Sequence, residues 1–325
     1  MGYGTYDTSS SAARSAARAA TGATAFTRSE DVTKGKAAAL DPSMDLRIKS
    51  HRECRDNDDN PESIPVSIML DVTGSMRRIP ELVINEFHKL VTVIRDRGAV
   101  QHPSVLFGAV GDAAFDRAPI QMGEFESSDE LAEKHLSHIY LEGGGGGNFG
   151  ESYDLALWFM ANKVETDHWD KRGQKGFLFV VGDEPLFDKV KAQQLEDVIG
   201  FAVEEDISMQ AVVDKLHERW HVFILRPGGT QHFADPAVRA TWTKFFMDER
   251  VVQVEDLNQI VPLIAGTISV MAGMDIADVV AAMKDSGFAD AEAAGTTLAK
   301  VATSSVATVG GGPAGDDADT GAVRL

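Results

Sequence analysis

Short apolar runs alternate with stretches of helical spacing over residues 64–273. The first run, IPVSIML at 64–70, is followed over 78–98 by apolar residues at intervals of three and four. Continuous apolar runs separated by helices are typical of a parallel sheet that helices cover on both faces. We therefore predict an α/β fold with a doubly wound, mostly parallel central sheet. The further strands are expected at 102–111, 118–125, 176–185, 220–229 and 250–256.

The segments outside this alternation differ from it in composition. Residues 1–45 are rich in Ala, Ser and Arg and predict a flexible arm, in which SSSAARSAARAA can form a short helix. We place the main domain at 46–273, with a polar lead-in before its first strand. A C-terminal helix is expected at 274–289, and the Gly/Ala-rich composition of 290–325 predicts a disordered tail.

The balance of charges limits the classes of partner. The chain has 31 Lys and Arg against 50 Asp and Glu, which gives a net charge of -19. A protein with this negative charge repels the phosphate backbone of nucleic acids, so we expect no nucleic-acid partner. It attracts cations or a basic protein instead. The single cysteine, Cys54, excludes an intramolecular disulfide framework and fits a reducing compartment.

The sequence also bears on location. The N-terminus has no apolar core of a signal peptide. No run reaches the roughly 18 consecutive apolar residues of a membrane span. We therefore expect a cytoplasmic protein with no membrane partner, or alternatively a component of a virion or intracellular assembly.

The motif DVTGS directly follows the first apolar run. Asp71, Thr73 and Ser75 occupy alternate positions, so their oxygens can converge on one point in a loop that leaves a strand. Hard oxygen donors of this kind suit Mg²⁺, Mn²⁺ or Ca²⁺. The structural alternative is that Ser75 caps the next helix.

Two further carboxylates stand in the same structural position. Asp112 follows the run at 102–111, and Asp183 lies near the end of the run at 176–185. Ligands of doubly wound sheets bind outside the carboxyl ends of the strands, where the strand order reverses. Three carboxylates at such ends therefore indicate one shared site.

DVTGS and the order of elements together resemble von Willebrand factor A domains, which carry a metal-ion-dependent adhesion site of pattern D-x-S-x-S after the first strand. The resemblance covers residues 64–273, about two thirds of the chain. It implies that Asp71, Thr73 and Ser75 bind the ion and that Asp183, in GFLFVVGDEP, completes the site.

The central loop GGGGGNFGES departs from the commonest A-domain pattern, because no Thr follows its paired glycines. It is similar to the integrin beta-subunit version, which implies that Glu151 contacts the ion. The same likeness, with the strand FGAVGD, implies a second metal site formed by Asp112, Asn148 and Glu151. The alternative is that Asp112 is a turn residue at a strand end.

In A domains an Asp or Glu of a partner protein completes the metal coordination. The resemblance therefore implies a metal-dependent protein-binding module rather than an enzyme. Intracellular bacterial members are often adaptors of AAA+ ATPases of the MoxR type, and standalone bacterial and phage members are also similar to this chain. We expect an AAA+ ATPase as partner, or neighbours in a phage particle or other large assembly of which this protein is a structural subunit.

DVTGS also resembles the D-K-T-G-T motif of haloacid-dehalogenase-type phosphotransferases. That resemblance implies a phosphatase with Asp71 as nucleophile, Asp183 and Asp188 holding Mg²⁺, and Lys175 as its lysine. Against it, most such enzymes other than ion pumps have a second Asp where Thr73 stands. The flap that usually comes after the first strand is also missing. We keep this hypothesis as the alternative.

Overall fold

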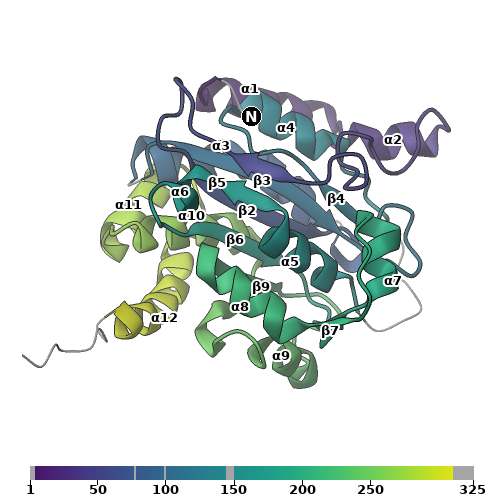
Figure 1. Ribbon diagram of the computed structural model, residues 1–325. Helices are drawn as coiled ribbons and strands as arrows, with labels where there is room; N and C mark the ends of the chain where they lie inside the picture. Colours follow the sequence, from purple (N-terminus) through teal and green to yellow (C-terminus); the bar gives the residue numbers. More distant parts are fainter. Residues whose placement is uncertain (1–3, 77, 99, 144–149, 310–325) are drawn as a thin grey trace, which may run out of the picture.

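A six-stranded sheet forms the centre of the molecule (Figure 1). The computed structural model describes residues 4–76, 78–98, 100–143 and 150–309, without the side chains of Ser75 and 302–309. The strand order is β10-β9-β6-β2-β3-β4, and neighbours are parallel except β3 and β4. The predicted α/β class with a mostly parallel sheet is confirmed. The strands are β2 (Ile64–Asp71), β3 (Pro103–Val110), β4 (Ile120–Met122), β6 (Gly176–Val181), β9 (Trp220–Pro227) and β10 (Val251–Val254).

Helices cover both faces of the sheet, which is why its central strands are apolar on both sides. In β2, Ile68 and Leu70 face one core, whereas Met69 faces the other. The first core is covered by α3 (Arg78–Val91), α4 (Asp129–His138) and α10 (Ile260–Met271), and α1 (Thr8–Thr21) packs against α3 and α4. The second is closed by α5 (Tyr153–Asn162), α8 (Met209–Arg219) and α9 (Pro236–Thr243).

The strand order reverses between β2 and β6. From β2 the chain runs to β3 and β4 on one side, and it then returns to β6 on the other. The register places Leu70 beside Val181, so Asp71 and the residues after Val181 lie at neighbouring carboxyl ends. This is the position at which doubly wound sheets form a binding crevice.

The N-terminal segment, for which the sequence predicts a flexible arm, contributes α1 and α2 (Thr27–Thr33) to the fold. The predicted short helix is present as α1, and it packs against α3 and α4. Its Arg14 and Arg18 both contact Glu133 of α4, at 3.0 and 3.1 Å. Tyr6 and Phe26 are buried in the first core. Two apolar anchors and these ion pairs hold a segment that is otherwise poor in large apolar residues.

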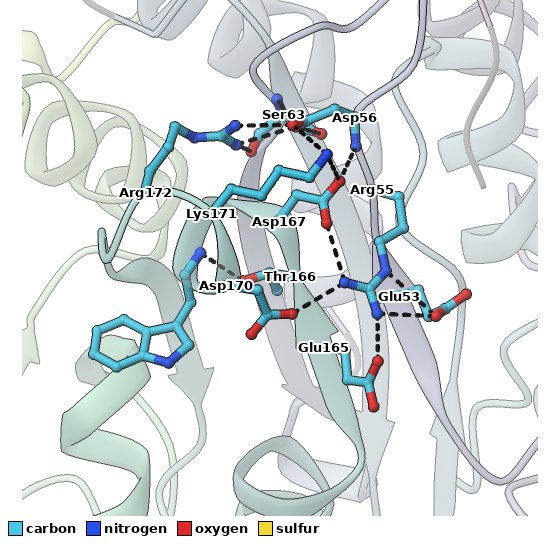
Figure 2. Close-up of polar contacts among 11 residues, drawn as sticks. Glu53, Arg55, Asp56, Ser63, Glu165, Thr166, Asp167, Asp170, Lys171 and Arg172 are labelled. Carbon is cyan, nitrogen blue, oxygen red and sulfur yellow. Dashed lines mark hydrogen bonds and ion pairs between the residues drawn. The ribbon is translucent and has the colours of Figure 1, made fainter.

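The polar lead-in is fixed mainly by charge. Its strand β1 (Arg52–Cys54) pairs in parallel with β5 (Val164–Thr166), outside the central sheet. Figure 2 shows the ion-pair network beside these strands, in which Arg55 bonds Asp167 at 3.1 Å and Asp170 at 3.0 Å. Arg172 bonds both oxygens of Asp56, at 2.9 and 3.1 Å. Asp167 and Asp170 belong to the short helix α6 (Asp167–Asp170).

The C-terminal region adds two helices to α10. The helix predicted at 274–289 is α11 (Ile276–Asp285), and α12 (Ala291–Val309) follows it. α12 occupies the first part of the segment for which the sequence predicts a disordered tail, and 310–325 lie outside the described residues. Gly266 of α10 permits this packing, because a Cβ there would lie 2.3 Å from a methyl group of Leu298.

Smaller elements complete the described chain. The sequence predicts one helix over 187–199, whereas the structure forms β7 (Lys189–Val190), the single turn α7 (Ala192–Gln194) and a π-helical turn over Leu195–Ile199. β7 pairs with β8 (Ile207–Ser208) in antiparallel orientation. None of the described helices combines the length and the apolar character that crossing a bilayer requires. Further turns are η1 (Gly74–Met76), η2 (Thr92–Asp96), η4 (Asp248–Arg250) and η5 (Leu257–Gln259).

Candidate metal site

Asp71 is the last residue of β2 and is completely buried. Its Oδ1 accepts hydrogen bonds from the backbone N–H of Thr73 at 2.9 Å and from the Thr73 hydroxyl at 2.6 Å. Its Oδ2 accepts a bond from the Tyr153 hydroxyl at 2.7 Å. The alternate spacing in DVTGS thus brings Asp71 and Thr73 into direct contact. Ser75 is part of the turn η1, and its side chain lies outside those described.

Tyr153 is a site residue that the sequence analysis missed. It opens α5, is completely buried and lies edge-on to the ring of Trp242. Gly182, directly after β6, makes room for it, since a Cβ at this position would lie 2.1 Å from the Tyr153 hydroxyl oxygen. The glycine of the motif GDE therefore admits a hydrogen-bond donor for Asp71, one residue before the carboxylate of Asp183.

Glu151 lies just before α5 and is almost fully buried. Its Oε2 has no hydrogen-bond partner among the described residues. Burial raises the pKa of Glu151 to about 9, and the neighbouring carboxylate of Asp71 contributes to this rise, followed by those of Asp116, Asp112 and Glu184. The structure therefore brings Glu151 into the same electrostatic neighbourhood as Asp71.

Asp183 lies one residue beyond Gly182, at the carboxyl end of β6, and is completely buried. Its Oδ2 accepts a hydrogen bond from the backbone N–H of His232 at 3.2 Å, while its Oδ1 has no partner within the described chain. Burial raises the pKa of Asp71 to about 7 despite the bonds from Thr73 and Tyr153, and the carboxylate of Asp183 contributes to this rise. Asp71 and Asp183 therefore repel each other across the switch point.

Arg226 is the second residue that the sequence analysis missed. It lies in β9, is completely buried, and donates a hydrogen bond to the carbonyl of His232. Burial lowers its pKa, and the carboxylate of Asp183 counteracts this shift. A charged residue inside the otherwise apolar strand WHVFILRP was the available signal, because buried charges are rare unless an opposite charge is near.

Asp112 follows β3 and is also buried. Its Oδ1 accepts a hydrogen bond from the backbone N–H of Ala114 at 2.8 Å, and its own N–H donates to Asp116 at 2.7 Å. These bonds form the tight turn that the structural alternative predicts. Its Oδ2 nevertheless has no partner in the described part of the chain. Asn148, the other predicted member of a second metal site, lies outside the described residues.

The donor set fits a hard divalent cation in its chemistry. Three buried oxygens, on Asp112, Glu151 and Asp183, lack a hydrogen-bond partner within the described ranges. Oxygen ligands with waters filling the remaining positions are what Mg²⁺ and Ca²⁺ take. No three side chains of His, Cys, Asp and Glu among the described residues lie close enough together to hold an ion by themselves. This result includes the predicted carboxylates Asp71, Glu151 and Asp183. An ion there would therefore also need the hydroxyls of Thr73 and Ser75 or bound water as ligands.

Two residues of the phosphatase hypothesis, Lys175 and Asp188, have other partners, whereas Asp183 lies near Asp71. Lys175 directly precedes β6, at the opposite end of that strand from Asp183, and its ammonium group contacts the carbonyl of His217. Asp188 is exposed and forms an ion pair with Lys244 at 2.7 Å. Because Lys175 lies at the other end of β6, it is not positioned beside Asp71, the proposed nucleophile.

Comparisons with known proteins give low similarity. No family model matches the chain, and no curated protein matches it. Similar solved structures include the pilus adhesin SpaC from Lactobacillus rhamnosus GG, with 10% identity over 71% of this chain and 32% of the adhesin, at a TM-score of 0.42. Proximal thread matrix protein 1 from the mussel byssus has 9% identity over 70% of this chain and 47% of that protein, at a TM-score of 0.42. A von Willebrand factor type A protein from Catenulispora acidiphila has 10% identity over 66% of this chain and 44% of that protein, at a TM-score of 0.35.

The chain thus spans less than half the length of each of these three proteins. At these TM-scores the likeness carries no argument about function. The fold class rests on the sheet itself, with its parallel strands, reversed order and helices on both faces.

Proposed function

We propose that the protein binds a divalent cation, Mg²⁺, Mn²⁺ or Ca²⁺, between the carboxyl ends of β2 and β6, and uses it to dock a partner protein. The observation that carries this proposal is the set of buried carboxylates at the switch point. Asp71 and Asp183 are completely buried, and oxygens of Glu151 and Asp183 have no partner among the described residues. Buried unpaired carboxylates cost free energy unless a cation balances them.

Each residue has a role in this proposal. Asp71 and the hydroxyls of Thr73 and Ser75 would form the inner set of ligands, with Asp183 and Glu151 contributing directly or through water. The Tyr153 hydroxyl orients Asp71 by holding its Oδ2. When bound, the ion supplies an open coordination position that accepts an oxygen of the partner, for which an Asp or Glu carboxylate has the right charge.

The resemblance to von Willebrand factor A domains supports a partner that offers such a carboxylate. A MoxR-type AAA+ ATPase is the partner class that we favour for an intracellular bacterial or phage protein of this kind. Neighbours in a phage particle or another large assembly are the alternative. In neither case does the protein act as an enzyme, because the residues proposed here are ligands and no positioned nucleophile or base is part of them.

The experiment separates metal binding from docking. Mn²⁺ is titrated into the metal-free protein, and the bound ion is followed by electron paramagnetic resonance and by water proton relaxation. We expect one bound ion with exchangeable waters in the wild type and none in Asp71→Asn. The exposed-acid variant Glu205→Gln is the control and should bind Mn²⁺ normally, since Glu205 is an exposed residue and not one of the proposed ligands.

Docking is then tested with two blocked tripeptides, Gly-Asp-Gly and Gly-Asn-Gly. The Asp peptide should displace water from the bound Mn²⁺ and lower the relaxation enhancement, whereas the Asn peptide should not. Mn²⁺ binding without any response to the Asp peptide would contradict docking while leaving the metal site intact. No Mn²⁺ binding at all would contradict the whole proposal.

A further inference from the structure

A groove of about 710 Å³ lies between the edge strand β10 and helix α12, away from the carboxylates of β2 and β6. Its floor includes Val251 and Val252 of β10, and its opposite wall includes Thr297 and Val301 of α12. β9 and β6 separate β10 from β2 in the sheet. The groove is therefore a second surface, and a ligand bound there would not depend on the metal site.

The edge of the sheet is open at Gln253, whereas the carbonyl of Val251 accepts a hydrogen bond from Arg239 at 3.4 Å. β10 is the last strand in the order, and within the described ranges no further strand pairs with its outer side. The carbonyl of Val254 accepts a hydrogen bond from Gly228, which comes directly after β9, at 2.7 Å. Because the backbone groups of successive strand residues point to alternate sides, those of Gln253 point away from β9. An N–H and a C=O directed outward from an edge strand are a template for another strand.

The two ends of β10 carry acidic side chains. Asp248 and Glu249 precede the strand and Glu255 follows it, and all three line the groove together with Lys300. Asp248 is paired with Arg239. Glu249 and Glu255 form no close ion pair with another described residue, but the charge of Glu249 acts on the neighbouring guanidinium of Arg250. The groove thus has an apolar floor and acidic side chains at each end.

We propose that this groove binds an extended segment of a partner protein that carries Lys or Arg at both ends of about four strand residues. The segment would add to β10 as a seventh strand of the sheet, as in known cases of strand addition. Main-chain hydrogen bonds to Gln253 would give affinity, and the basic residues would pair with Glu249 and Glu255. The length reflects the four residues of β10 between the two acidic ends.

Two fluorescein-labelled peptides test the proposal on the full chain by fluorescence anisotropy. The peptide KKVTVTKK has the required charges, and EEVTVTEE has the same strand residues with the opposite charges. We expect saturable binding of the first and no binding of the second. The double variant Glu249→Gln/Glu255→Gln should weaken binding of the basic peptide by about tenfold, which corresponds to about 1.4 kcal/mol. The matched double variant Glu204→Gln/Glu205→Gln, at exposed acids elsewhere, should bind like the wild type.

The variant Gln253→Pro tests strand addition itself. Proline removes the outward N–H and leaves the ladder with β9 in place, since proline is tolerated on edge strands whose N–H faces outward. We expect an unchanged thermal transition and at least about tenfold weaker peptide binding. Equal binding of both peptides, or full binding by a folded Gln253→Pro variant, would overturn the proposal. So would a dimer in sedimentation experiments that Gln253→Pro abolishes, because a second copy would then occupy the edge.

Discussion

Two clusters of carboxylates in this protein differ in what balances their charge. Around the lead-in, Asp56 and Asp167 each contact at least two cationic side chains (Figure 2). At the switch point, Asp71 and Asp183 are completely buried and repel each other. The pKa values show the same contrast. Partial burial raises the pKa of Asp56, but the bonds from Arg172, Ser63 and Lys171 outweigh it and hold the pKa below its ordinary value. The pKa of Asp71 rises to about 7.

The difference indicates two uses of the same residue type. A network that contains its own cations fixes one segment of the chain to another, and it is complete in the isolated protein. The switch-point cluster has one buried cation near Asp183, Arg226, but oxygens of Glu151 and Asp183 still lack a partner among the described residues, so we expect it to take up a cation from solution. We therefore expect the first cluster to respond to mutation of its own partners and the second to respond to divalent ions.

The largest expected effect is stabilisation by the metal. Mg²⁺ or Mn²⁺ at about 100 times its dissociation constant should raise the free energy of unfolding by about 2.7 kcal/mol, because the ion binds the folded state. Asp71→Asn should abolish this gain. Thermal unfolding with Mg²⁺ and with EDTA provides the measurement. An equal gain in wild type and Asp71→Asn would mean that the ions act elsewhere.

Removal of a cation from the paired network should cost less and should not depend on metal. Arg172→Ala removes two bonds to Asp56 and one to the carbonyl of Ser63. We expect a loss of about 1–2 kcal/mol in urea unfolding, with or without Mg²⁺. Arg97→Ala, which breaks an exposed pair with Asp285, is the matched control and should cost at most about 0.5–1 kcal/mol. Mg²⁺ dependence of the Arg172→Ala effect would break the distinction between the clusters.

The next largest effect is a difference between the two clusters in how their carboxylates make the free energy of unfolding depend on pH. In the metal-free protein, the folded pKa of Asp71 is about 7 and that of Glu151 about 9, both above their unfolded values near 4. Between about pH 4 and pH 9 the two carboxyl groups bind more protons in the folded state than in the unfolded chain, so the free energy of unfolding falls as pH rises. Asp56 has a lowered pKa, and its contribution is constant over this window and is lost only as pH falls below about 4.

Urea unfolding from pH 5 to pH 9 in EDTA checks this prediction. Stability should decrease with pH, and saturating Mg²⁺ should flatten the slope because the bound ion favours the ionised carboxylates. Asp71→Asn should also reduce the slope, without Mg²⁺. A metal-free wild type whose stability rises over this range would contradict the raised pKa values.

The smallest expected effect is that of Glu151→Gln at pH 7 without metal. Since the pKa of Glu151 is about 9, its carboxyl is already protonated at this pH, and the substitution should change stability by less than about 0.5 kcal/mol. The same variant should bind Mn²⁺ about 10–100-fold more weakly if Glu151 supports the ion. Unchanged Mn²⁺ affinity would remove Glu151 from the site and leave Asp71 and Asp183 as its carboxylates.

The elements that position the site could be predicted because local patterns encode them. The apolar runs that end at Asp71 and near Asp183 are continuous in the sequence, and the rule for doubly wound sheets places their ends together. Tyr153 could not be assigned in this way. Its bond to Asp71 joins residues 82 positions apart, and it depends on the absence of a Cβ at Gly182.

The terminal segments show a second limit. Ala-rich sequences such as those of α1 and α12 fit both disorder and a packed helix, and contacts with the rest of the fold decide between them. For α1 these are the ion pairs of Arg14 and Arg18 with Glu133. For α12 the decisive contact is the close approach of Leu298 to Gly266. Neither partner can be recognised from the segment itself.

Calorimetric titration of Mg²⁺ into the metal-free protein at pH 7.5 tests the central claim most directly, with Asp71→Asn, Asp183→Asn and the surface control Glu205→Gln measured alongside. We predict saturable binding of one ion to the wild type and to Glu205→Gln, and none to the two site variants, all of them folded by circular dichroism. No binding to the wild type, or equal binding to all four proteins, would contradict a metal site at the switch point.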